Sequence, residues 1–276
     1  MLRLLLNHRT THHTSNSKNS TRSSEFQETA DEKVSDKKIQ KLLSQKISDL
    51  SLTIKNSRLE AFIDELYQEL ERAGISFKPK SYLTDGWGCP NKVPAIGIPF
   101  YLADQKLYSL QAQFTGTKVE DEKEVMMFLR HEAGHAFNYA YRLYRKPEWH
   151  RLFGRFSQPY KDDYKTDPFS PRFVHHFSGW YAQKHPDDDF AETFAVWLTP
   201  NSEWQKRYNG TPALAKLLYV DKMAWKYGQQ PPVITEGKLD MPLQEMTMTL
   251  DEWFTKCKNT KHASFLVRNA PNNETF

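Results

Sequence analysis

Residues 122–143 read EKEVMMFLRHEAGHAFNYAYRL, and this stretch decides the class of the fold. It contains no proline, and its apolar residues recur at spacings of three and four, which is the pattern of an amphipathic α-helix. Its single glycine, Gly134, has no side chain and would let another backbone or a ligand approach closely. The stretch therefore predicts one long helix with a close neighbour.

The centre of this helix carries the HExxH motif His131-Glu132-Ala133-Gly134-His135. Residues four apart share one face of a helix, so His131 and His135 can present two imidazole nitrogens to one metal ion. Glu132 lies one position further round, where its carboxylate can take a proton from a metal-activated water. The motif predicts a zinc hydrolase with one zinc ion, and the helical context disfavours the alternative of a chance pair of surface histidines.

Composition narrows the class of protein further. The chain has 276 residues, of which 38% are hydrophobic, and we expect one catalytic domain with additions. The net charge of +4 comes from scattered Lys and Arg, so nucleic acid is not an expected partner. Two cysteines, Cys89 and Cys257, are too few for a disulfide framework or a Cys-rich zinc site, which favours a reducing compartment.

Targeting signals are weak. No segment approaches the length of about 18 apolar residues that a membrane span needs, and residues 2–6 are too short for the core of a signal peptide. We therefore expect a soluble, cytoplasmic protein. Residues 1–31 are rich in Ser, Thr, Asn and His and carry no acidic residue before Glu25. This composition predicts a disordered tail, with an organelle transit peptide as the alternative.

A helical N-terminal extension is expected over residues 32–75. Apolar residues at helical spacing predict a first helix over residues 32–52. A second helix is expected to begin at Ser57, where Glu60 can complete a capping box, and to end near Gly74. These helices are expected to pack on the catalytic domain.

The catalytic domain is expected over residues 76–230. Three segments rich in β-branched and aromatic residues and broken by Gly and Pro predict short strands: 77–83, 93–102 and 106–114. Ala95–Tyr101 is the candidate for an edge strand that could hold a substrate backbone, because Pro99 suits an edge. The predicted fold class is α+β, a mainly helical zincin-like domain with a small mixed sheet beside the HExxH helix.

Two further segments carry less information. The aromatic and Pro-interrupted stretch over residues 145–183 is expected to cover or line the cleft, because long loops within compact domains are usually functional. Residues 231–276 are expected to form a C-terminal extension with one helix from Leu250 to Lys261.

Residues 187–198, DDDFAETFAVWL, predict a second important helix. Acidic residues in a first turn complement the helix dipole, and the preceding Pro186 suits a helix entry. Asp188 and Glu192 lie four apart on one side, as a metal ligand and its supporting carboxylate should. Asp187 and Asp189 are interpreted as a solvated start of the helix.

A catalytic zinc needs a third protein ligand and an open fourth position. No third histidine follows His135 closely, so this acidic helix is the natural source of the ligand. We prefer Asp188 on the metal and Glu192 supporting a ligand His through its other ring nitrogen. The opposite assignment stays open, because Glu reaches further and is the commoner third ligand.

With these residues in view, the chain resembles a family of zinc-binding metallopeptidases, mostly bacterial and functionally uncharacterised. The similarity runs from about Lys78 to Tyr227. The matching segments, in order, are Trp87-Gly88-Cys89-Pro90, Val93–Leu102, Leu129–Ala136, Phe153-Gly154-Arg155, Trp180–Gln183, His185–Leu198 and Tyr219-Val220-Asp221. The resemblance implies a gluzincin-like zincin that hydrolyses peptide bonds.

A more distant likeness is to the catalytic domain of anthrax lethal factor, a gluzincin that pairs HExxH with an acidic helix containing FAE. That resemblance implies zinc binding by Asp188 and a tyrosine near the metal at Tyr181. The closer family carries Glu where this chain has Asp188. The shorter side chain would need a small helix shift, a water bridge or a ligand role for Glu192.

The sequence thus predicts a zinc-dependent peptidase acting on a peptide or protein substrate, with Glu132 as general base. Tyr181, or failing that His175 or His176, would donate a hydrogen bond to the tetrahedral oxyanion. For the two histidines an ordinary role as polar loop residues is favoured. The alternatives are a zinc-binding protein without turnover that acts through protein contacts, and a nucleic-acid-associated protein.

Overall fold

The computed structural model describes residues 36–116, 118–160 and 165–259. The chain divides into two units, Met1–Gln45 and Lys46–Phe276. The described part of the first unit contains a helix over residues 36–43, and the predicted tail over 1–31 lies outside the described residues.

The first predicted helix ends earlier than expected. The second unit opens instead with a short 3-10 helix, η1 (Ile47–Asp49). The backbone N–H groups of Ile47 and Ser48 donate to Met248 and Met246, each at 3.0 Å. Because the C-terminal segment takes these hydrogen bonds, a helix that continued to residue 52 would lose them.

The second predicted helix is α2 (Arg58–Arg72), and its start is set by the expected cap. The Ser57 hydroxyl accepts from the backbone N–H of Leu59 at 3.2 Å. Glu60 Oε2 accepts from the N–H of Asn56 at 2.8 Å, one residue before the cap, so the capping box itself is not formed.

A small parallel sheet consists of β1 (Lys80–Thr84) and β2 (Ala95–Pro99), in a register that pairs Lys80 with Ala95. On its other side β2 forms an antiparallel bridge between Gly97 and Gly88. A Cβ at position 97 would lie 2.7 Å from Thr84 Cγ2, which is why glycine stands there. β2 lies at the edge of this two-stranded sheet, as expected. All of its residues are nevertheless buried, and Gly88 contacts it on the side away from β1. Its role in holding a substrate backbone stays a prediction.

The third predicted strand, over residues 106–114, is a helix, α3 (Gln105–Thr115). Asp104 caps it by accepting from the N–H groups of Lys106 and Leu107, both at 2.9 Å. Its buried residues Leu107, Leu110 and Gln111 follow helical spacing. The short 3-10 helix η2 (Phe100–Ala103) connects β2 to it.

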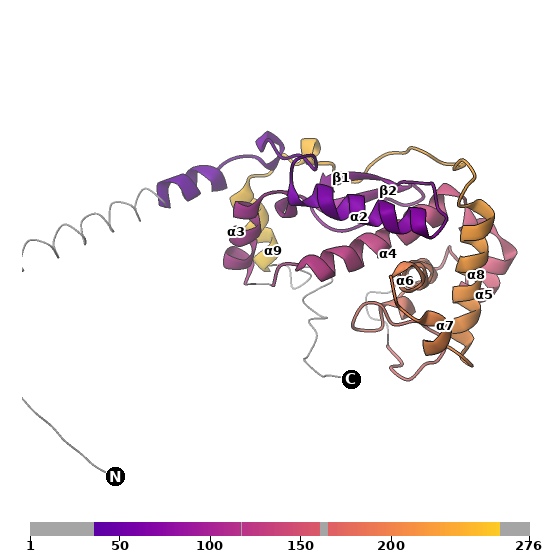
Figure 1. Cartoon of the computed structure of the whole chain (residues 1–276). Helices are drawn as coiled ribbons and strands as arrows, with labels where there is room; N and C mark the ends of the chain where they lie inside the picture. Colours follow the sequence, from indigo (N-terminus) through magenta and orange to yellow (C-terminus); the bar gives the residue numbers. More distant parts are fainter. Residues whose placement is uncertain (1–35, 117, 161–164, 260–276) are drawn as a thin grey trace, which may run out of the picture. The chain divides into compact units, whose positions relative to one another are not determined.

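The core of the second unit is built on α4 (Glu122–Ala140), the predicted HExxH helix, which begins with a capping box between Asp121 and Glu124. Figure 1 shows α4 running below the β1–β2 pair, with α2 on the same side as the strands. A buried ion pair joins the two helices, since Arg130 donates to both carboxylate oxygens of Glu69 at 2.7 and 2.8 Å. Two hydrogen bonds of this kind fix the orientation of α2 on α4.

The acidic segment forms the predicted helix, α6 (Pro186–Leu198), and packs on α4 at Gly134. A Cβ at position 134 would lie only 2.9 Å from Ala191 Cα and 3.0 Å from Ala191 O. Glycine is therefore what lets the two helices approach so closely. A further helix, α8 (Pro212–Tyr227), covers the other side of α6 and was not anticipated from the sequence.

The fold is thus mixed, with many helices and a two-stranded parallel sheet in the described residues. The remaining helical elements are η3 (Leu143–Arg145), α5 (Pro147–Phe153), η4 (Tyr181–Gln183), α7 (Trp204–Arg207), η5 (Leu243–Glu245) and α9 (Leu250–Asn259). α9 matches the predicted C-terminal helix as far as the described residues extend. None of the helices in the described ranges is long and apolar enough to span a membrane.

Candidate metal centre

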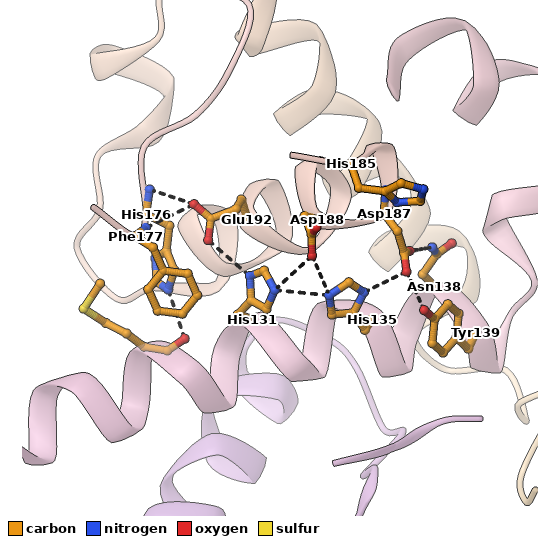
Figure 2. Close-up of polar contacts among 11 residues, drawn as sticks. His131, His135, Asn138, Tyr139, His176, Phe177, His185, Asp187, Asp188 and Glu192 are labelled. Carbon is orange, nitrogen blue, oxygen red and sulfur yellow. Dashed lines mark hydrogen bonds and ion pairs between the residues drawn. The ribbon is translucent and has the colours of Figure 1, made fainter. Parts of the chain in front are cut away.

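The two histidines of the HExxH motif point from α4 toward α6 and are both buried (Figure 2). His131 Nε2 and His135 Nε2 lie 3.1 Å apart. Two nitrogens that share a tetrahedral zinc ion at about 2.1 Å each lie about 3.4 Å from one another. The spacing of the rings therefore suits two ligands of one ion.

Asp188 on α6 completes the group. Its Oδ1 lies 3.5 Å from His135 Nε2 and 3.9 Å from His131 Nε2. Its Oδ2 is buried without a hydrogen-bond partner among the residues that the structure describes. Buried polar atoms normally have a partner, so this oxygen fits a site made to hold a ligand. Within the described residues, His131, His135 and Asp188 are the one group of His, Cys, Asp and Glu that could hold a metal ion.

Glu192, the other predicted acid, lies one turn further along α6 and behind His131. Its Oε1 is 3.1 Å from His131 Nδ1, on the side of the ring away from the ligand group. Its Oε2 accepts from the backbone N–H groups of Phe177 and His176 at 3.1 and 3.3 Å. A His whose Nδ1–H is held in this way presents the lone pair of Nε2 to a metal.

Asp187 performs the same task for His135, and its interpretation as a solvated residue was wrong. Only 1% of it is exposed. Its Oδ2 lies 3.0 Å from His135 Nδ1 and accepts from the Tyr139 hydroxyl, while Oδ1 accepts from Asn138 Nδ2 at 2.8 Å. Burial raises the pKa of Asp187, but His135 and these hydrogen bonds outweigh it and hold the pKa below its usual value.

Asp189 is also buried rather than solvated, with 2% exposed. Its Oδ2 lies 2.5 Å from Lys216 Nζ on α8, so this pair joins α6 to α8. All three aspartates at the start of α6 therefore face protein. The crossing of α6 with α4 and α8, which local sequence does not reveal, decides which partner each one meets.

Glu132 is the remaining carboxylate of the HExxH motif. It is buried, and its Oε2 has no hydrogen-bond partner in the described part of the chain. Burial raises the pKa of Glu132 to about 7, with His135 opposing the shift and Asp188 and Asp187 adding to it. Burial, with His135 adding to the shift, lowers the pKa of His131 to about 3, so this imidazole is neutral, as a metal ligand must be.

Tyr181, in η4, stands edge-on to His131 with ring centroids 5.7 Å apart. Burial, followed by the charges of Asp188 and Glu132, raises its phenol pKa well above the usual value. The phenol therefore remains a hydrogen-bond donor beside the ligand group. Tyr181, which was selected from the sequence, lies next to His131 in the structure.

The two histidines considered as alternative donors are engaged elsewhere. His176 Nε2 lies 3.0 Å from the carbonyl oxygen of Met127. The His175 ring packs on Trp180 with centroids 4.0 Å apart. Sequence reasoning missed what the segment does contribute, which is backbone N–H groups that hold Glu192. Such a role leaves no signal in side-chain identity.

Comparison with known proteins adds nothing to this picture, since no protein family, curated protein or solved structure matches the chain. Two imidazole nitrogens and one carboxylate oxygen, all from buried residues and close to one another, form a donor set that suits a divalent metal ion.

Proposed function

We propose that this protein is a zinc-dependent metallopeptidase that hydrolyses peptide bonds with Glu132 as general base. The observation that supports it is the convergence of His131, His135 and Asp188 on one point, beside the buried carboxylate of Glu132. Two His and one carboxylate are a ligand set of catalytic zinc sites, which keep a fourth position open. When bound, the ion supplies Lewis acidity, which polarises a carbonyl group and lowers the pKa of water.

The residues around this centre would each have a separate role in hydrolysis. Glu132 takes a proton from the attacking water and passes it to the departing amine. Tyr181 donates a hydrogen bond to the oxygen that becomes negatively charged. Glu192 and Asp187 hold the two imidazole rings in the tautomer and orientation that bind the metal.

The arrangement favours Asp188 over Glu192 as the third ligand. Asp188 Oδ1 faces both ligand nitrogens, whereas Glu192 is committed to His131 Nδ1 and two backbone N–H groups. The shorter side chain of Asp188 is compensated by the close approach of α6 to α4 at Gly134.

The alternative is a zinc-binding protein without turnover that acts through protein contacts. Structural zinc sites are normally closed by four protein ligands. The described residues supply three ligands. The buried Oε2 of Glu132, which is not a ligand, has no hydrogen-bond partner in the described residues. Such an atom would cost stability in a purely structural site. The geometry therefore supports hydrolysis better than it supports a structural role.

Metal analysis combined with a peptide digest tests this proposal. Purified wild type and Glu132→Gln should each bind one zinc ion per chain, because Glu132 is not a ligand. Only the wild type should cleave a mixed peptide library, with fragments identified by mass spectrometry. Glu122→Gln, an exposed change at the start of the same helix, is the matched control and should cleave like the wild type. Equal cleavage by Glu132→Gln would refute the role of Glu132.

A further inference from the structure

A cavity of about 470 Å³ opens beside the metal centre, on the side of His135. Two of its lining residues, Asp187 and Tyr139, are the ones that hold the His135 ring. A volume of this size is in the range of pockets that hold small ligands. A peptide that extends from the metal centre past the Asp187 side of His135 would enter this cavity.

The walls of the cavity are aromatic and are fixed to α6. The Tyr160 ring stacks on His185 with centroids 3.9 Å apart. His185 Nδ1 caps α6 by accepting from the N–H of Asp187 at 3.1 Å, and its Nε2 lies 2.9 Å from the carbonyl oxygen of Gln158. The wall is thus attached to the helix that carries Asp188. Phe156 supplies a second aromatic surface.

Lys92 is the one cation among the described lining residues. Its Nζ lies 5.7 Å from the centroid of the Phe156 ring and 5.9 Å from that of Tyr144. No carboxylate of the described residues forms an ion pair with it. The carboxylate in the lining, Asp187, is already satisfied by His135, so it does not neutralise this charge.

The backbone at Lys92 adopts a conformation that is uncommon for lysine. Residues 90–93 form a turn in which Val93 N–H donates to the carbonyl oxygen of Pro90 at 2.8 Å. Lys92 is the third residue of this turn and has a φ of 62°, a conformation that glycine or asparagine adopts more easily. Such strain is common at binding sites.

We propose that this cavity, the Lys92 cavity, binds a carboxylate-bearing residue of the substrate. The carboxylate would pair with Lys92, and the methylene groups before it would lie on the Phe156 ring. The carboxylate belongs either to an Asp or Glu side chain or to the C-terminus of a peptide. The claim that the bound peptide is a substrate rests on the proposed function. The claim that the cavity binds a peptide carboxylate does not.

Two substitutions of Lys92 test the charge without disturbing the turn. Lys92→Gly removes the cation and relaxes the backbone at its positive φ. Lys92→Glu reverses the charge. Lys226→Glu makes the same change in net charge on an exposed residue of α8 that does not line the cavity, so it is the matched control.

The readout is binding of fluorescein-labelled peptides that differ only at one central residue, Glu, Gln, Lys or Phe, measured by fluorescence anisotropy. The protein carries Glu132→Gln and is loaded with zinc, so that no peptide is cleaved. Each peptide is made with a free and with an amidated C-terminus, which separates the two sources of the carboxylate. We expect the carboxylate-bearing peptide to bind about three- to fivefold more tightly than its neutral counterpart, as for a solvent-accessible ion pair.

This preference should disappear in Lys92→Gly and turn toward the Lys peptide in Lys92→Glu. It should stay unchanged in the control Lys226→Glu. In the protein with Lys92 it should weaken as the salt concentration is raised. Tightest binding of the Phe peptide, or a preference that is the same in all the Lys92 variants, would overturn the proposal. The two ideas fail separately. A Lys92-dependent preference in a protein that cleaves nothing upholds the cavity and contradicts the peptidase, whereas cleavage without such a preference does the reverse.

Discussion

Gly134→Ala tests whether the close contact between α4 and α6 builds the metal centre. The added methyl group would lie 2.9 Å from Ala191 Cα, 3.0 Å from Ala191 O and 3.0 Å from Phe194 Cβ. Carbon atoms pack comfortably at about 3.5–4.0 Å, so the helices must separate by roughly 0.5–1 Å. Because two of the three clashing atoms are backbone atoms, no change of rotamer relieves the clash.

The expected loss of stability is modest. Overpacking of this kind costs about 1–3 kcal/mol. Alanine is better than glycine within a helix by about 1 kcal/mol, which offsets part of that cost. We expect Gly134→Ala to lower the free energy of unfolding by about 0–2 kcal/mol, measured by urea denaturation in the presence of a chelator.

The effect on metal binding should be larger than the effect on stability suggests. Asp188 stands three residues before Ala191 on α6, so a shift of α6 carries its carboxylate away from His131 and His135. A ligand displaced by about 1 Å leaves a site too loose to bind well. We expect zinc affinity, measured by competition with a chromophoric chelator, to fall about tenfold or more.

A matched control separates helix propensity from packing. Glu122→Ala also places alanine in α4, but at an exposed position far from the crossing. It should leave both stability and zinc affinity close to those of the wild type. If Gly134→Ala were as stable as the wild type and bound zinc equally well, the argument that the helix contact sets the position of Asp188 would be wrong.

Three other predictions test the roles of single side chains. Asp188→Ala should abolish stoichiometric zinc binding, whereas Glu192→Ala should weaken it by about 10–100-fold, and loss of zinc in the second variant alone would reverse the ligand assignment. Tyr139→Phe removes a hydrogen bond to Asp187 and should weaken zinc binding about tenfold without changing the fold, as judged by circular dichroism. Arg130→Met leaves a buried carboxylate on α2 unpaired and should lower stability by about 3–5 kcal/mol in urea denaturation; an unchanged midpoint would contradict this.

The helices that carry the centre were predictable because their signals are local. The HExxH spacing places His131 and His135 on one face of any helix that contains it. The acidic first turn and the apolar residues of α6 likewise define that helix from its own sequence. The spacing of four paired Asp188 with Glu192, and the resemblance to gluzincins favoured Asp188 as the ligand.

The errors lie where distant segments meet. α3 was taken for a strand because its aromatic and β-prone residues were weighted above the helical spacing of its buried residues. The bridge between Gly97 and Gly88 was not expected, because nothing in the sequence of β2 indicates it. Asp187 was interpreted as solvated, since an acidic residue in a first turn looks the same whether it faces water or the His135 ring.

The two helices that bear the ligands are joined by a long aromatic segment. An ion held by His135 and Asp188 would act as a cross-link across that segment, much as a disulfide bond closes a loop. In an unfolded chain Asp188 would be far from His131 and His135. The free energy of metal binding would therefore add to the free energy that holds α4 against α6. Removal of the metal should therefore loosen the segment between these helices first, and the supply of metal would govern how long the protein resists proteolysis.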